Sequence, residues 1–417
     1  MISKGRVIRV GLFFAIVNFL ITAAIGILLR YNNVFPIYDF AVRYWIHGHS
    51  HTGFLGWVFL ALVTLCFEML LPKNSKINNK IYRLIIYFQI AVLGMLITFP
   101  FMGYAAPSIL FSTFHLILSL VFAIVFFKNA DKKDLASKFM KAALLFMLLS
   151  NLGPLALGPL MVLDLKGTPW YDMAIYFYLH FQYNGWFTLA VFSLLIKMLE
   201  QMSVFVDIEK GKSILKLLIY GTILTLALSA LGFGFSPYVK VIGFVGATLQ
   251  LLAGFVLLKM LFVKSDLSKI LINDWIKWFF GLALFSWLIK ILRQLLSSFP
   301  IISSFVYFNR EAIMTYLHLS FLGFTSCFLI GLCIVKNYLS TSSLISRVGF
   351  GLFLLGVVLM ELTLGIKSLP QFLNIPLLKS IDIALFAESL VLFIGISILL
   401  FFAFIFPNRH IKQKRLS

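Results

Sequence analysis

The chain has 417 residues, of which 61% are hydrophobic and only 12% are charged. A water-soluble fold of this size cannot bury so much apolar surface, so the composition predicts a membrane protein with the lipid bilayer as its main partner. The formal charge of +20 does not predict a nucleic-acid partner, because the 35 lysines and arginines are spread along the chain instead of gathering on one face.

Apolar runs long enough to cross a bilayer recur along the whole sequence. A helix of about 20 apolar residues spans a hydrocarbon layer of about 30 Å, and charged, proline or asparagine clusters separate the runs. We therefore expect an all-α polytopic membrane protein with a single transmembrane domain, residues 1–417. Its twelve predicted helices lie near residues 8–30, 45–71, 84–104, 107–127, 139–163, 172–197, 213–235, 239–262, 276–297, 311–335, 345–366 and 381–406.

Charges between the apolar runs predict the orientation. Most lysines and arginines fall in the two tails and in the connections after even-numbered helices. Because cytoplasmic loops carry an excess of such residues, we expect both termini to be cytoplasmic, in the inner (cytoplasmic) membrane of a bacterium. The first run follows Lys4, Arg6 and Arg9 as in a signal peptide, but it lacks a clear small-residue cleavage site, so we expect a retained helix.

Histidines are the clearest candidates for chemistry. At 1.5 Å per residue, four of the seven are expected at nearly one depth, about 10 to 13 Å below the outer surface. Imidazole nitrogens that converge in a dry environment suit heme iron, copper or non-heme iron. These four lie near the outer ends of helices that should run inward: His51, His115, His180 and His318.

Two carboxylates inside the apolar runs also need an explanation. Glu388 falls in the histidine layer, and Glu361 lies near the outer end of its helix. A carboxylate within the bilayer costs about 3 kcal/mol on insertion scales, so each should face the bundle interior. Structural pairing with Lys290, Arg293 or Arg310 and a step in a proton route explain them equally well.

The surroundings of three histidines repeat at intervals of about four helices, which predicts three repeats in a pseudo-threefold arrangement, residues 1–128, 129–262 and 263–417. A glycine near an imidazole leaves space that suits either a close neighbouring helix or a flat macrocycle. Each histidine is followed after four residues by a glycine and an aromatic residue: His51 with Gly56-Trp57, His180 with Gly185-Trp186 and His318 with Gly323-Phe324.

These features together resemble the large subunit (subunit I) of the heme-copper oxidase superfamily, and the nitric oxide reductase branch most closely. The segment from His180 to Gly185 resembles the helix 6 pattern of the reductases, with Asn184 where the family has glutamate. His51 followed by threonine resembles their helix 2 His-Thr pair. His49-Ser-His51 also resembles a His-x-His heme motif that the family carries on helix 10.

The resemblance implies a b-type heme and a second metal, copper or non-heme iron. It places His51 and His318 as heme ligands, with Gly56, Gly323 and Arg310 beside the cofactor. Asn184, Glu361 and Glu388 would serve catalysis or proton supply. The candidate metal ligands are His51, His180, His318, His115 and His49.

Several departures from the family limit what the resemblance implies. The run at 213–235 has no histidine, so the paired second-metal ligands of the family are missing, and the helix near 311–335 offers His318 alone. We therefore do not expect a complete low-spin heme plus binuclear centre. For His115 a hydrogen bond to a neighbouring helix is the simpler interpretation, and His49 is expected at the membrane interface.

Three functions remain open on this basis. The first is a redox protein that binds a small gas, oxygen or nitric oxide, and reduces it with electrons from a cytochrome c-type or quinol donor. The second is a non-enzymatic heme- or copper-binding membrane protein of the nitric oxide response or of metal delivery. The third is a multi-pass transporter, although transporters usually show twofold repeats and broken helices.

Overall fold

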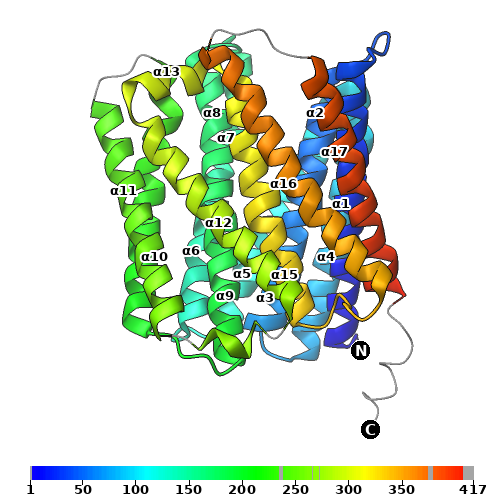
Figure 1. The fold of residues 1–417 in the computed structure, drawn as a ribbon, viewed down its shortest axis with the longest axis vertical. Helices are drawn as coiled ribbons and strands as arrows, with labels where there is room; N and C mark the ends of the chain where they lie inside the picture. Colours follow the sequence, from blue (N-terminus) through cyan, green and yellow to red (C-terminus); the bar gives the residue numbers. More distant parts are fainter. Residues whose placement is uncertain (1, 234–237, 265, 272, 374–378, 407–417) are drawn as a thin grey trace.

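The computed structural model describes residues 2–233, 238–264, 266–271, 273–373 and 379–406. His410 and the basic C-terminal tail lie outside these residues. Every regular element of the described residues is a helix, and the helices stand side by side in one bundle (Figure 1). Eleven helical segments in this part of the chain are long and apolar enough to cross a membrane. The prediction of a helical, multi-pass membrane protein is confirmed.

The predicted helix near 172–197 is present but is less apolar than the other eleven. It runs from Pro169 to Gln201 and carries His180, Gln182 and Asn184 in its middle. The long helical segments, in chain order, are α1 (Lys4–Val34), α2 (Val42–His51) with η1 (Thr52–Phe59) and α3 (Leu60–Leu70), α4 (Ser75–Met102), α5 (Ala106–Asn129), α6 (Leu135–Ser150) with α7 (Leu152–Val162), α8 (Pro169–His180) with η2 (Phe181–Phe187) and α9 (Thr188–Gln201), α10 (Ile208–Thr225) with η3 (Leu226–Phe233), α11 (Tyr238–Lys259) with η4 (Met260–Lys264), α12 (Asp274–Ser297), α14 (Arg310–His318) with η6 (Leu319–Ser326) and α15 (Cys327–Val335), α16 (Leu344–Leu373), and α17 (Lys379–Ile398) with η7 (Leu399–Ile405).

Short polar segments fix where several helices begin. An Asn or Asp side chain accepts a backbone N–H of the first turn at five of these starts, which satisfies a donor that the helix itself leaves unpaired. The capping residues are Asn74, Asp134, Asp207, Asn273 and Asn309. Two shorter elements, η5 (Leu267–Lys269) and α13 (Pro300–Phe308), lie in connections.

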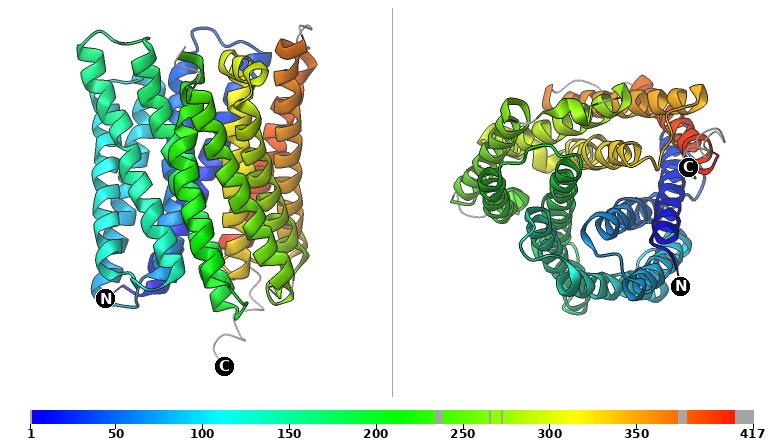
Figure 2. Two further views of the ribbon diagram at one scale, coloured as in Figure 1. Left: turned by 90° about the vertical axis from the view of Figure 1, so that its left-hand side faces the viewer. Right: turned by 90° about the horizontal axis from the view of Figure 1, so that it is seen from below.

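The three segments with the repeated histidine pattern form the centre of the bundle. Seen end-on, they lie inside the other helices (Figure 2), and 89% of the apolar window is buried both in Val42–Leu70 and in Arg310–Val335. Residues 180–194 of the third segment are all buried. The three segments contact one another, because η1 and η2 both contact η6 and α3 contacts α9.

Each central segment changes helix type directly after its histidine. The π-helical elements η1, η2 and η6 begin immediately after His51, His180 and His318. A π turn inserts one extra residue into an α-helix and is frequent at functional sites. The histidine pattern in the sequence coincides with such a distortion three times, and two further π-helical elements of the described residues, η4 and η7, contain no histidine.

The repeated glycines lie at close helix contacts. A Cβ atom on Gly56 would be 2.8 Å from the Asn18 side chain of α1, and one on Gly185 would be 2.5 Å from Phe146 of α6. A Cβ on Gly323 would be 2.5 Å from Ser286 of α12. Of the two uses predicted for these glycines, a close neighbouring helix is the one that these contacts support.

Candidate functional site

A cavity of about 530 Å³ lies beside two of the central segments. Its walls come from α1, from α2 and η1, from α14 and η6, and from α16 and α17. This volume is within the range of small-molecule and cofactor sites. The apolar part of the wall includes Phe19, Phe54, Phe321, Leu322 and Leu392.

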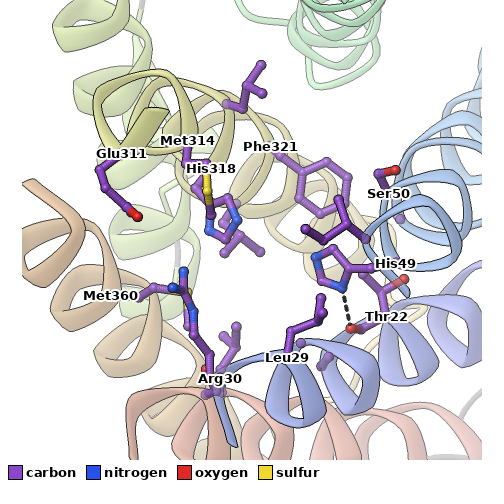
Figure 3. A pocket seen from close by; sticks show the side chains of 18 of the residues that line it. Thr22, Leu29, Arg30, His49, Ser50, Glu311, Met314, His318, Phe321 and Met360 are labelled. Carbon is purple, nitrogen blue, oxygen red and sulfur yellow. Dashed lines mark hydrogen bonds between the residues drawn. The ribbon is translucent and has the colours of Figure 1, made fainter. Parts of the chain in front are cut away.

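Two histidines from different central segments face this cavity, His49 from α2 and His318 at the end of α14 (Figure 3). The Nδ1–H of His49 donates a hydrogen bond to the carbonyl oxygen of Thr22, at 2.9 Å. Because Nδ1 carries the proton, Nε2 keeps its lone pair, which is the usual arrangement of a metal-binding histidine. His318 Nδ1 is buried and has no hydrogen-bond partner among the described residues.

Two glycines near His49 lie so close to other side chains that a larger residue would crowd them. A Cβ atom on Gly26 of α1 would be 3.3 Å from Cε1 of His49, and one on Gly53 would be 3.1 Å from Thr22 Cγ2 and 3.3 Å from the Phe321 ring. Both glycines line the cavity. Larger residues at these positions would take up space beside the imidazole.

The cavity has a charged part as well as an apolar one. The Arg30 side chain points into it (Figure 3), is only 8% exposed, and forms no hydrogen bond or ion pair with any described residue. Lys367 is also buried but is paired, with Glu311 Oε1 at 3.4 Å and Asp382 Oδ1 at 2.9 Å. Arg310 is exposed at the rim. Glu311, Asp382 and Glu388 are the carboxylates nearest in effect to Arg30, but none of them forms an ion pair with it, so its guanidinium could also bind an anionic group of a ligand.

His51 does not line this cavity. Its Nδ1–H donates to the carbonyl oxygen of His47 in the same helix, at 2.9 Å, and its ring stacks on Phe99 with the centroids 4.3 Å apart. The sequence paired His51 with His318, whereas in the structure His49 shares the cavity with His318. His49 was expected at the membrane interface.

His115 and His180 also lie apart from the cavity. His115 of α5 is buried between the rings of Phe59 and Phe88, with centroid distances of 4.7 and 4.9 Å, and its Nε2 has no hydrogen-bond partner in the described part of the chain. His180 donates from Nε2 to the carbonyl oxygen of Thr222 at 2.8 Å.

Asn184 belongs to the hydrogen-bond network of His180. Its amide nitrogen donates to His180 Nδ1 at 3.2 Å, so both ring nitrogens of His180 are in use. Its amide oxygen accepts from the hydroxyl of Tyr316 at 2.9 Å and from Nε2 of Gln294 at 3.4 Å. Asn184 therefore links the central segments to α12.

The two carboxylates of the predicted proton route lie outside the cavity wall. Glu388 Oε1 accepts a hydrogen bond from the Thr363 hydroxyl at 2.6 Å. Both carboxylate oxygens of Glu361 are buried and have no hydrogen-bond partner among the described residues. Among the predicted heme-binding residues, His318 and Arg310 line the cavity, and His51, Gly56 and Gly323 do not.

In the part of the chain that the structure describes, no three His, Cys, Asp or Glu side chains are grouped so that they could hold a metal ion. A heme would need only two histidines from the protein, because the porphyrin itself supplies four nitrogens. A second metal held by His51, His115 and His180 would need ligands that this structure does not bring together.

Sequence reasoning missed three features of the site. From the sequence alone, Arg30 would be interpreted as an interfacial charge at the end of an apolar run, and Gly26 as a small packing residue. Thr22 contributes a backbone carbonyl, which no side-chain pattern reveals. The one available signal is that Thr22, Gly26 and Arg30 recur every four residues and so lie on one face of α1.

No family model matches this chain, and no curated protein matches it.

Proposed function

We propose that the protein is an integral membrane redox protein that binds heme b in the large cavity, where His49 and His318 would hold the iron. The observation that carries the proposal is that two histidines, from two different central segments, face one cavity while Nε2 of His49 is free to coordinate. The proposal keeps the heme and His318 of the sequence prediction and replaces His51 with His49.

The residues present fit such a cofactor in two respects. The aromatic and aliphatic wall suits a porphyrin. Arg30, buried and without a hydrogen bond or ion pair to any described residue, would hold a heme propionate, with Arg310 at the rim as a second anchor. Heme would supply a one-electron redox couple to the protein.

Both ring nitrogens of His180 form hydrogen bonds within the protein, and this helps to decide whether the protein is an enzyme or a non-enzymatic heme protein. With His180 and Asn184 committed to hydrogen bonds, a gas-reducing second metal has fewer ligands than the family requires. This favours heme binding for electron transfer or sensing over reduction of oxygen or nitric oxide. Copper, the gas substrate and a cytochrome c-type donor stay predictions.

We also propose that the bundle is built from three four-helix repeats related by pseudo-threefold symmetry. In each repeat, the second helix would be central, with a π turn after its histidine and a glycine packed on the helix before it. The orientation with both termini in the bacterial cytoplasm belongs to the same proposal and depends on the distribution of lysine and arginine.

Heme analysis of the purified protein tests the proposed function. Detergent-solubilised protein from cells that make heme should show a Soret band, and its pyridine hemochrome should identify about one b-type heme per chain. A protein that stays colourless after incubation with hemin, while remaining folded and monodisperse, would contradict the proposal.

A further inference from the structure

An open pocket lies on the outside of the bundle, at the start of α4. It has a volume of about 470 Å³, and it is lined by six residues of this helix: Lys76, Asn79, Lys80, Arg83, Leu84 and Tyr87. Three of the six are exposed cations, and none is acidic. The pocket shares no residue with the large cavity. A ligand bound here would therefore be distinct from the proposed heme.

The three cations lie on one face of α4. Residues 76, 80 and 83 are spaced by four and three positions, which puts their side chains on the same side of an α-helix. None of their charged groups forms an ion pair or a hydrogen bond with another residue of the described chain. Like charges at this spacing repel one another, so the arrangement gains stability when an anion binds beside them.

The position of the cations in the helix adds to this repulsion. Partial positive charge gathers at the N-terminal end of a helix, where acidic side chains are favourable and basic side chains are not. The first turn of α4 contains Lys76 and no acidic residue. The helix N-terminus and the three side chains thus favour the same kind of ligand, a negatively charged one.

The polar groups of the pocket are hydrogen-bond donors. Lysine and arginine side chains donate but do not accept. Oδ1 of Asn79 already accepts from the backbone N–H of Ile2, at 3.3 Å, and its amide nitrogen has no partner among the described residues. The ligand must therefore be rich in acceptors, and a phosphate group combines negative charge with several acceptor oxygens.

The apolar surface next to the pocket indicates a lipid as the source of the phosphate. On the same face of α4, the partly exposed Tyr87 is followed by the exposed side chains of Ile90 and Ile97. Ile97 lies ten residues after Tyr87, which is about 15 Å along a helix and half of a hydrocarbon layer of about 30 Å. An acyl chain against this strip would place its head group at the level of the cations, where tyrosine is also common.

We propose that the pocket at the start of α4 binds the head group of one anionic phospholipid, whose phosphate contacts Lys76, Lys80 and Arg83. Its acyl chain lies against Ile90 and Ile97. A phosphatidylcholine head group has no net charge and carries a cationic group that the three side chains repel, so the pocket selects against it. This site goes beyond the proposed function and does not depend on heme.

Native mass spectrometry of the full-length protein in a non-ionic detergent tests this site. Dioleoylphosphatidylglycerol and dioleoylphosphatidylcholine have the same acyl chains, so the ratio of their affinities measures the contribution of the head group. We expect the first phosphatidylglycerol to bind at least about tenfold more tightly than the first phosphatidylcholine, because each cation near an anionic lipid contributes about fivefold. The ratio should fall at high salt, since the cations are exposed.

Replacement of the three cations by glutamine removes their charge and keeps hydrogen-bond donors of similar length. The triple variant Lys76→Gln, Lys80→Gln and Arg83→Gln should bind the two lipids with about equal affinity. If this variant does not fold, the ratio of the two affinities still decides the question on the unchanged protein.

The triple variant Lys128→Gln, Lys132→Gln and Lys133→Gln is the matched control. It removes the same charge from three exposed lysines at the same end of the bundle, where α5 ends, and none of these lysines lines the pocket. The preference for phosphatidylglycerol should stay at the wild-type level. Equal affinity for the two lipids in the unchanged protein, a preference that survives loss of the pocket cations, or an equal loss in both triple variants would overturn the proposal.

Discussion

Replacement of either His49 or His318 by alanine is expected to abolish the Soret band of the purified protein. Each alanine removes one of the two imidazoles that face the large cavity, and the groups that remain, the apolar wall and the buried Arg30, do not bind iron. We expect heme content to fall at least about tenfold in each variant, which corresponds to a loss of about 1.4 kcal/mol or more in binding free energy. Absorbance at the Soret maximum relative to 280 nm measures the effect.

His51→Ala is the matched control for these variants. His51 lies in the same helix as His49, two residues later, but its Nδ1–H bonds within the helix and its ring stacks on Phe99, away from the cavity. Heme content should stay at the wild-type level. Loss of heme in His51→Ala, with retention in His49→Ala, would contradict the assignment and restore the pairing that the sequence suggested.

Gly26→Leu is expected to exclude heme from a protein that still folds. The leucine Cβ would lie 3.3 Å from Cε1 of His49, so the imidazole has to shift by a few tenths of an ångström, and the rest of the side chain would occupy space beside it. Because of this crowding, we expect a small drop in the thermal midpoint of the heme-free protein. Heme occupancy should drop at least about tenfold, as measured by pyridine hemochrome.

Gly281→Leu provides the control for added bulk. A Cβ atom on Gly281 of α12 would meet no atom within 4 Å, so the leucine points into open space. This variant should keep both its heme and its thermal midpoint. Full heme occupancy in Gly26→Leu would show that the cofactor, if present, does not lie against this face of α1.

The sequence predicted the helices well because crossing a bilayer requires long apolar runs, which are visible without a structure. It failed to distinguish His49 from His51 for a physical reason. Residues two apart on an α-helix face directions about 200° apart, so the choice depends on how the helix is rotated. In α2, where both histidines lie, only Gly48 is buried and both histidines are partly exposed, so a preference for burial does not separate them.

The repeated pattern of histidine, glycine and aromatic residue was found in the sequence, but its structural meaning was only partly accessible. Glycines at positions 56 and 323 could have faced a macrocycle or another helix. The structure shows that Gly56 packs against Asn18 and Gly323 against Ser286. The π turns after the three histidines depend on the backbone path through the bundle centre, which residue preferences do not encode. Thr22 contributes a backbone carbonyl to the site, and because every residue has one, the sequence cannot single it out.

Electron paramagnetic resonance of the oxidised wild-type protein tests most directly whether His49 and His318 meet at one iron. Two imidazole ligands give a low-spin ferric heme, so nearly all of the bound heme should give a low-spin signal. That signal should be absent in His49→Ala and in His318→Ala. A high-spin ferric signal in the wild-type protein, or no heme signal at all, would show that the two histidines do not bind one iron.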